Sequence, residues 1–323
     1  MRPARPLIAL AVALVFAGAA VAAPERWQRA WPDTDFSRTS VPFDEIIAGG
    51  PPKDGIPAID DPAFRPAAEE ERIADREPVM TLEFEGAEPR AYPIRYLMWH
   101  EIVNDTVAGR PVAVTFCPLC NTGMVFDGEV NGQERVFGVS GLLRHSVMIM
   151  FDRETESWWQ QGTGEGIVGA HTGDRLELLP AWMESWQEFR ARNPDGLVMA
   201  EPDWPRRYGD NPYRNYDTSQ QPFLFDGADP PHGLDPMARM VRVGERAWPM
   251  ARVREAGEIT EAGVTITWRE GQASALDTGR IGDGREVGTV RVRDAAGNDL
   301  PHDIPFAFAF NAFHPDGEWM LGR

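Results

Sequence analysis

The stretch VAVTFCPLCNTGMVFD (residues 112–127) holds both cysteines of the chain between two runs of β-forming residues. The β-branched and aromatic residues of 112–116 are typical of a strand that runs directly into Cys117. Asn-Thr-Gly (121–123) follows Cys120 and indicates a turn, after which alternation resumes. The sequence therefore predicts that the C-x-x-C pair lies at the tip of a strand–turn–strand unit.

The flanking sequence predicts more strands and few helices. Residues 79–97 and 124–141 read as hairpins, the second with Asn131-Gly132 as its turn, and residues 145–152 alternate again. Short helices are expected over residues 95–105 and 180–196, the second because Pro180 begins it and aromatic residues share one face. The expected fold class is mainly β with a few short helices (α+β).

Two pieces of the chain recur. RAYPI (90–94) returns as RAWPM (246–250), and VAVTFCPLC (112–120) is echoed by VTITWREGQ (264–272) at a similar offset. Similar patterns at similar spacing predict two related β modules packed together. The second is degenerate, since Arg269 and Gln272 stand in place of the two cysteines.

The expected division of the chain into domains follows from this recurrence. Residues 23–78 form a Pro/Asp-rich wrapping segment, 79–200 the first β module with the C-x-x-C site, 201–234 a loop, and 235–323 the second β module.

The N-terminal residues predict export. Residues 1–22 begin with two arginines, continue with an apolar run, and end in Ala20-Val21-Ala22, which fits a signal-peptide cleavage site. We expect cleavage near Ala22 and a periplasmic or secreted protein. No later stretch is apolar enough for a transmembrane segment, so we expect none in the mature chain.

Composition argues against a nucleic-acid partner. The formal net charge is −18, and no Lys/Arg cluster is present to bind a phosphate backbone. None of the common glycine-rich phosphate or dinucleotide motifs occurs, so no nucleotide cofactor is expected. The sequence names no partner.

The cysteine pair allows three roles. A disulfide across four residues would stabilise the fold by only about 2 kcal/mol, so a purely structural clasp is a weak reason to keep it. A thiol–disulfide redox pair of the thioredoxin kind needs a helix that starts at the cysteines, and none is expected here. The third role is metal binding, in which the pair supplies two thiolates to a soft or borderline ion, copper or zinc.

A metal site needs ligands besides Cys117 and Cys120. His100 is the first candidate, because the helix that carries it precedes the cysteine strand and can fold back over it. Glu101 can support that histidine or act as a ligand itself. Further supporting candidates are the polar residues Asp105, His145, Asp152 and Arg153.

Several segments together carry a resemblance to a known family. KDGIPAIDDPAF, AYPIRYLMWHEIVND, VAVTFCPLCNTGMVFD, FGVSGLL, FDRETESWWQQ and FAFNAFHPDGE occur in this order from about Asp44 onward. This set resembles the prokaryotic domain of unknown function family 3179. The resemblance implies that His100, Glu101, Asp105, both cysteines, Asp152 and Arg153 sit at family motif positions. It names no activity and no metal.

Three functions therefore stay open at the level of sequence. The leading one is a secreted metal-binding protein that holds copper or zinc through Cys117, Cys120 and His100. The alternatives are a thiol–disulfide redox protein that uses the same pair, and a non-enzymatic interaction module in which the pair is a clasp. Whether the protein is an enzyme is also open.

Overall fold

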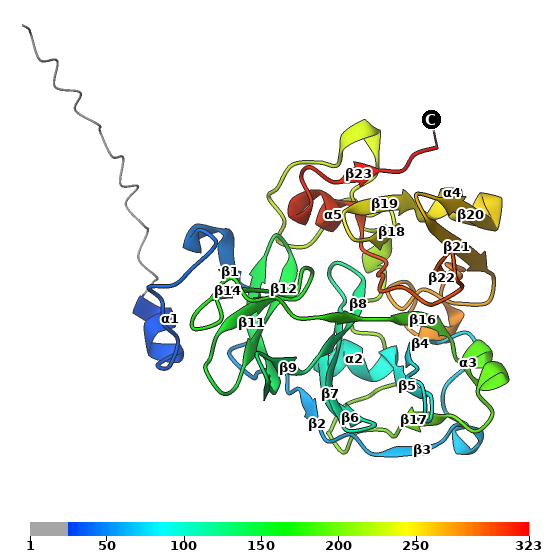
Figure 1. Ribbon diagram of the computed structural model, residues 1–323, viewed down its shortest axis with the longest axis horizontal. Coiled ribbons are helices and arrows are strands. Elements are labelled where there is room, and N and C mark those ends of the chain that lie inside the picture. The colour runs from blue at the N-terminus through cyan, green and yellow to red at the C-terminus, as the bar shows by residue number, and fades with distance from the viewer. Residues whose placement is uncertain (1–24, 323) are drawn as a thin grey trace, which may run out of the picture.

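The computed structural model describes residues 25–322, and most of its regular structure is strand (Figure 1). The signal peptide expected over residues 1–22 lies outside the described residues. Strands form because β-branched and aromatic residues alternate through most segments and turn residues separate them.

Five sheets of three or more strands build the described chain. They are arranged as the blades of a five-bladed β-propeller (Figure 1). The first sheet contains β1 (Ile46–Ala48), β11 (Phe137–Arg144), β12 (Val147–Asp152), β13 (Trp158–Gln160) and β14 (Glu165–Val168). The second contains β15 (Leu178–Leu179), β8 (Thr122–Asp127), β7 (Arg110–Cys117), β6 (Ile102–Val107) and β2 (Ile59–Asp60).

The third sheet contains β16 (Ala181–Ser185), β4 (Pro78–Leu82), β5 (Arg90–Pro93), β17 (Leu197–Met199) and β3 (Phe64–Pro66). The fourth contains β18 (Met240–Val243), β19 (Arg246–Pro249) and β23 (Glu318–Trp319), and the fifth β20 (Glu258–Glu261), β21 (Val264–Arg269) and β22 (Thr289–Asp294). A small separate hairpin pairs β9 (Glu129–Val130) with β10 (Gln133–Glu134).

Helices are short. They are α1 (Glu25–Ala30), α2 (Ile94–His100), α3 (Trp186–Arg192), α4 (Met250–Ala256) and α5 (Ala307–Phe313). Single 3-10 turns occur at Phe43–Glu45, Ala67–Glu69, Tyr216–Thr218, Pro231–Gly233 and Ile281–Asp283.

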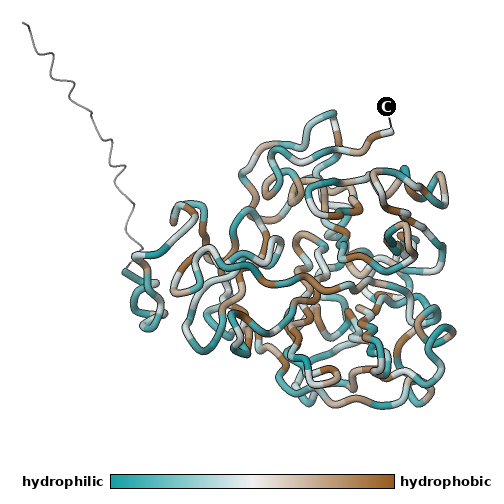
Figure 2. The backbone as a smooth tube through the Cα atoms, in the orientation of Figure 1, coloured by the Kyte–Doolittle hydropathy of each residue, from teal (hydrophilic) through white to brown (hydrophobic). Residues whose placement is uncertain are grey.

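Contacts between sheets position the cysteine strand. β6 contacts β11 of the first sheet, β8 contacts β16 of the third, and β16 contacts β22 of the fifth. At the end of α5, Phe313 packs against Arg144 and His145 of the first sheet, which closes the ring. The most apolar strands lie inside (Figure 2). The largest core cluster includes both cysteines, so the C-x-x-C pair is part of the packed interior.

The prediction of two modules is wrong, although the echo behind it has a structural counterpart. β5 runs into α2, and β19 runs into α4, and each helix has seven residues. The two units belong to different sheets, and the chain around them is divided among five sheets. The recurring segment therefore indicates a local strand–helix unit that occurs twice, and it does not divide the chain into two modules.

Two helix boundaries differ from expectation. The helix predicted over 95–105 ends at His100, because Glu101 adopts a positive φ and the chain continues as β6. The helix predicted over 180–196 is only α3, since residues 181–185 pair with β4 as a strand. Ser185, not Pro180, caps that helix by accepting a hydrogen bond from the Glu188 N–H.

Candidate functional site

The cysteine pair lies where the sequence placed it, at the tip of a hairpin. β7 ends at Cys117, β8 begins at Thr122, and Cys117 pairs with Thr122 across the hairpin. Asn121 closes the turn with a φ of 58°. Both cysteines are free thiols with at most 1% of their surface exposed. The pair is therefore held in a fixed turn that excludes water.

The Cys117 sulfur is surrounded by hydrogen-bond donors. Burial by itself would raise the pKa of its thiol. Hydrogen bonds from the Cys120 thiol and from the backbone N–H groups of Met148, Cys120 and Leu119 outweigh burial, and the pKa of Cys117 is lowered. These donors favour the thiolate in the way that a helix N-terminus does in other proteins.

Cys120 has the opposite character. Burial, its hydrogen bond to Cys117 and the negative charge of that neighbour raise the pKa of Cys120 well above the usual value. Its Sγ lies 2.9 Å from Thr122 Oγ1, and that hydroxyl donates to Gln161 Oε1 over 2.7 Å. Gln161 Nε2 in turn donates to Thr115 Oγ1 over 3.0 Å. The surroundings therefore lower the pKa of Cys117 and raise that of Cys120.

Glu101 is the acidic group beside the pair. Ile102 pairs with Thr115, so the preceding residue, Glu101, lies across from Phe116. The Phe116 N–H donates a hydrogen bond to the Glu101 carbonyl over 2.9 Å. The residue has only 8% of its surface exposed, and its carboxylate forms no hydrogen bond or ion pair with the other residues of 25–322. Burial, followed by the negative charge of Cys117, raises the pKa of Glu101 to about 8.

The backbone at Glu101 is strained. Its φ of 59° and ψ of −32° lie outside the regions that residues with a Cβ prefer. Strain of this kind persists where the surrounding structure enforces it, and it gathers at functional sites. The structure therefore holds a buried carboxyl next to Cys117 at a cost in backbone energy.

A loop covers the cysteine turn. Residues 200–239 contain no strand, and Tyr213 and Tyr216 of this loop lie over the turn. Tyr216 Oη donates to the Leu119 carbonyl over 2.9 Å and accepts the Phe223 N–H over 3.1 Å. Burial raises the pKa of both tyrosines, and the charge of Cys117 adds to the effect. No sequence pattern indicates that these tyrosines belong to the site, because the loop lies far from the cysteines along the chain.

His100 uses both ring nitrogens in other contacts. Nδ1 lies 2.7 Å from the Pro57 carbonyl oxygen and Nε2 lies 2.7 Å from Tyr208 Oη. Burial lowers the pKa of His100, so the ring is neutral at pH 7. To bind a metal ion, the imidazole would have to give up one of these hydrogen bonds.

The other expected site residues have local partners. Asp105 accepts a hydrogen bond from Tyr92 Oη, and His145 Nε2 lies 3.4 Å from Glu45 Oε2. Asp152 accepts hydrogen bonds from Trp159 Nε1 and the Thr155 N–H, and Arg153 pairs with Asp60. Asp105 thus connects the second sheet to the third, and Arg153 connects the end of β12 in the first sheet to the second. Asp152 joins two strands of the first sheet.

Within residues 25–322, no group of three or more His, Cys, Asp or Glu side chains is placed to hold a metal ion. The same residues contain no helix with the length and apolarity that a membrane crossing requires.

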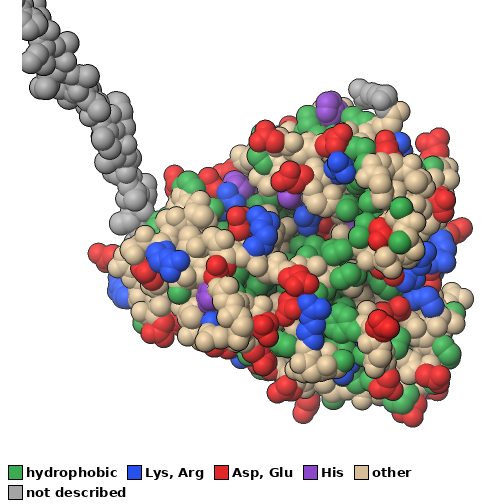
Figure 3. All heavy atoms as spheres, viewed as in Figure 1, with side chains coloured by type: hydrophobic (Ala, Val, Ile, Leu, Met, Phe, Trp, Pro, Cys, Tyr) green, Lys and Arg blue, Asp and Glu red, His purple; other side chains and the backbone are tan. Residues whose placement is uncertain are grey.

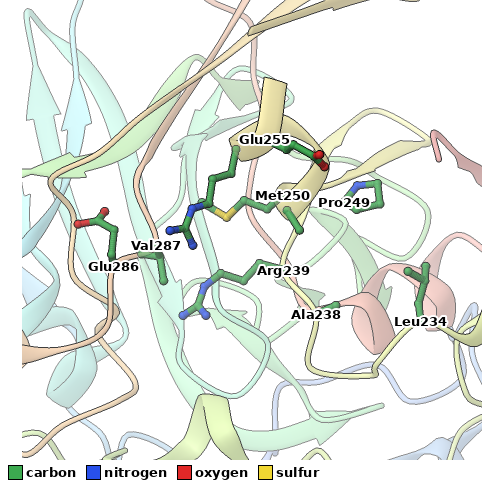
Figure 4. Close-up of a pocket in the computed structure, with 10 residues that line it drawn as sticks. Leu234, Ala238, Arg239, Pro249, Met250, Glu255, Glu286 and Val287 are labelled. Carbon is green, nitrogen blue, oxygen red and sulfur yellow. The ribbon is translucent and has the colours of Figure 1, made fainter. Parts of the chain in front are cut away.

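Two larger cavities lie near the surface. One of about 530 Å³ lies beside α4 and is bounded by Arg239, Met250 and Val287 (Figure 4). Its charged residues are already paired in part, since Arg239 contacts Asp217 and Glu286 contacts Arg76. The other cavity, of about 600 Å³, is bounded by residues 42–47, by His145 and by residues 222–226 of the covering loop.

Comparison with curated proteins and with solved structures finds no match. A family model described as "Protein of unknown function (DUF3179)" matches residues 53–317, a span that includes the cysteine turn, Glu101 and the covering loop. Because this match covers most of the chain, the protein belongs to the DUF3179 family.

Proposed function

We propose that Cys117 and Cys120 form a thiol–disulfide redox centre, with Cys117 as the attacking thiolate and Cys120 as the resolving thiol. The observation that carries this proposal is geometric: two free thiols are held together in one buried hairpin turn. The directions of their pKa shifts, lowered for Cys117 and raised for Cys120, agree with it. The thiolate is the form that attacks a disulfide, and a protonated neighbour keeps the second thiol in reserve.

The exchange balances with a disulfide compound R–S–S–R as the oxidant. The Cys117 thiolate attacks one sulfur, the S–S bond of the compound breaks, and one R–S⁻ leaves with the electron pair. Cys120 then attacks the Cys117 sulfur of the mixed disulfide, an intramolecular S–S bond forms, and the second R–S⁻ leaves. The two thiol protons end on the two leaving groups, so two R–SH are released.

Glu101 supplies a proton during this exchange. With a pKa of about 8 its carboxyl carries a proton near neutral pH, gives it to the first leaving group and, as a carboxylate, then accepts the proton of Cys120. Two features support this role: the carboxyl has no other partner within residues 25–322, and its pKa of about 8 suits proton transfer near neutral pH. A carboxyl at its ordinary pKa would have no proton to donate at pH 7.

Access to the centre requires movement of the covering loop. Both sulfurs are buried beneath Tyr213 and Tyr216, and Tyr216 is tied to the cysteine turn by one hydrogen bond, to Leu119. A single hydrogen bond is worth about 1 kcal/mol net. Opening must also break the packing of Tyr216 on Phe306 and move Tyr213, and it would then admit a substrate to Cys117.

The test is a redox titration of the purified mature protein. Equilibration in dithiothreitol buffers of known potential, followed by alkylation and mass spectrometry, should show a reversible two-electron step between two thiols and one disulfide. Alkylation of the reduced protein at increasing pH should reveal one thiol that reacts below the usual thiol range of about 8.5. Two thiols that never form the disulfide at any potential would contradict the proposal.

Metal binding is a second candidate, favoured by one observation. The thiolate character of Cys117 beside a second sulfur suits copper(I) or zinc. Elemental analysis of protein purified without chelators separates the two candidates. About one equivalent of copper or zinc, lost together with Cys117, would favour metal binding over redox exchange.

A further inference from the structure

The cavity of about 600 Å³ lies between three segments of the chain that are distant in sequence. Residues 42–47 form one wall, His145 of the β11–β12 turn forms the second, and residues 222–226 of the covering loop form the third. Small-molecule sites in proteins have volumes of about 300 to 1,000 Å³. The cavity is therefore large enough for a small organic compound.

One tyrosine connects a wall of this cavity to the cysteine turn. The Tyr216 hydroxyl donates a hydrogen bond to the carbonyl of Leu119, which lies between the two cysteines in sequence. The same hydroxyl accepts a hydrogen bond from the N–H of Phe223, whose neighbours Pro222 and Leu224 line the cavity. On the other wall, the lining residue His145 is followed by Ser146, whose buried hydroxyl lies beside Tyr216. Tyr216 thus contacts both the cysteine turn and the loop segment that lines the cavity, and a compound in the cavity would reach Cys117 when Tyr213 and Tyr216 move aside.

The charged groups that line the cavity are acidic. Glu45 is neutralised by Arg144, with which it forms an ion pair over 2.7 Å. Asp44 and Asp226 also line the cavity, and their side chains form no ion pair with any residue of 25–322. Burial, and then the charge of Arg144, lowers the pKa of His145, so this ring adds no positive charge at pH 7. Two carboxylates therefore remain without a counter-charge.

An apolar wall faces these carboxylates. Leu224 has 46% of its surface exposed, and it lines the cavity together with Phe225 and Ile47. Phe223 beside it is 49% exposed, and the covering loop presents all three of the large apolar side chains that are exposed within residues 25–322, the third being Trp204. Acidic side chains are also abundant on the face of the molecule seen in Figure 3.

From this arrangement we infer that the cavity binds the substrate of the redox centre, a small thiol or disulfide compound that carries positive charge. Its ammonium or guanidinium group lies at Asp44 and Asp226, and its apolar part packs on Leu224 and Phe225. The inference rests on the proposed redox function, because the cavity matters for exchange only if the cysteines react. An anionic disulfide is repelled by the same two carboxylates and by the overall net charge of −18.

The experiment compares two disulfides of opposite charge as oxidants of the reduced full mature protein: cystamine, a dication, and oxidised glutathione, an anion. Disulfide formation at Cys117 is followed by acid quenching and mass spectrometry at low and at 0.5 M salt. We expect cystamine to react at least about tenfold faster at low salt, with the preference falling as salt screens the carboxylates.

Substitution of two carboxylates at a time tests whether the preference for cystamine originates at the cavity. Asp44→Asn with Asp226→Asn should lower the cystamine rate constant about five- to tenfold and leave the rate with oxidised glutathione unchanged or higher. The control is Glu129→Gln with Glu134→Gln on the exposed β9–β10 hairpin, which changes the net charge equally but lies outside the cavity. The control pair should change the rate with cystamine by less than about twofold.

The outcomes are distinguishable. If both disulfides oxidise the protein equally, or if both substitution pairs have the same effect, the cavity is not the substrate site and the redox function stands. If neither disulfide oxidises Cys117, the redox function itself fails. Binding of cystamine to the Cys117→Ser variant by calorimetry gives a readout without chemistry, and loss of that heat on substitution of Asp44 and Asp226 would support the inference.

Discussion

Two units of the propeller have the same order of strands and helix, and a glutamate in one stands at the position of a glycine in the other. In the first, β5, α2, β6 and β7 span residues 90–117; in the second, β19, α4, β20 and β21 span residues 246–269. The residue after each helix donates its N–H back to the helix and adopts a positive φ. In both units its carbonyl accepts a hydrogen bond from the third strand, from Phe116 in one and Trp268 in the other.

At that matching position the second unit has Gly257 and the first has Glu101. Gly257 adopts a φ of 73° and a ψ of −42°, a conformation that glycine takes at little cost. Glu101 adopts nearly the same angles with a Cβ. The second unit shows what backbone physics prefers here. The first departs from it only where a carboxyl comes to lie beside Cys117, whose counterpart is Arg269.

The largest expected effect separates the third strands of the two units. Cys117→Ser should lower the rate of exchange with cystamine more than about a hundredfold, since a hydroxyl does not ionise near neutral pH. Arg269→Ser at the matching position should leave the rate within about twofold, because Arg269 is over half exposed and contacts Glu188. Equal losses in both variants would indicate unfolding instead, which circular dichroism detects.

The second effect is on the pH dependence of stability. The pKa of Glu101 is about 8 in the folded protein and near 4.5 when unfolded, so the folded state binds the extra proton between these values. Unfolding free energy should therefore fall as pH rises from about 4.5 to 8, at about 1.4 kcal/mol per unit at most. Glu101→Gln should remove this fall in urea titrations. An equally steep fall in the variant would refute the assignment to Glu101.

A third, smaller effect concerns the exchange rate itself. Glu101→Gln keeps the shape of the side chain but has no acidic proton to donate, so exchange at pH 7 should slow about tenfold. The pKa of Cys117 should stay unchanged, because Glu101 is neutral over the pH range in which Cys117 ionises. Thiolate absorbance near 240 nm measures this pKa. A variant with the normal rate and the normal pH profile would leave Glu101 without a role in proton transfer.

The smallest effect tests the backbone comparison directly. Gly257→Ala should destabilise the protein by about 1 kcal/mol through its positive φ alone, because an added Cβ meets no atom within 4 Å. Glu101→Gly should stabilise it at pH 8, where strain and a buried charge are both removed. Urea unfolding of the two variants should thus give shifts of opposite sign. Shifts of the same sign would mean that the two positions are not equivalent.

Some features could be predicted from the sequence because they depend on neighbouring residues. The hairpin tip at the cysteines and the Asn131-Gly132 turn follow from local alternation and turn chemistry. The boundaries of α3 did not follow, because pairing of residues 181–185 with β4 overrides local helix signals. The local recurrence was also visible, but its assignment to separate blades was not.

The site depended on contacts that no local pattern encodes. Sequence determined that two thiols would share one turn, and it named Glu101 as a neighbour. Only the tertiary structure decided that Tyr208 and Pro57 occupy the His100 ring, that Gln161 and Thr122 hold Cys120, and that Tyr213 and Tyr216 cover the pair. The reason is physical: a pKa, a cavity or a hydrogen bond is set by the groups that folding brings within a few ångströms, and these come from strands and loops separated by up to about a hundred residues.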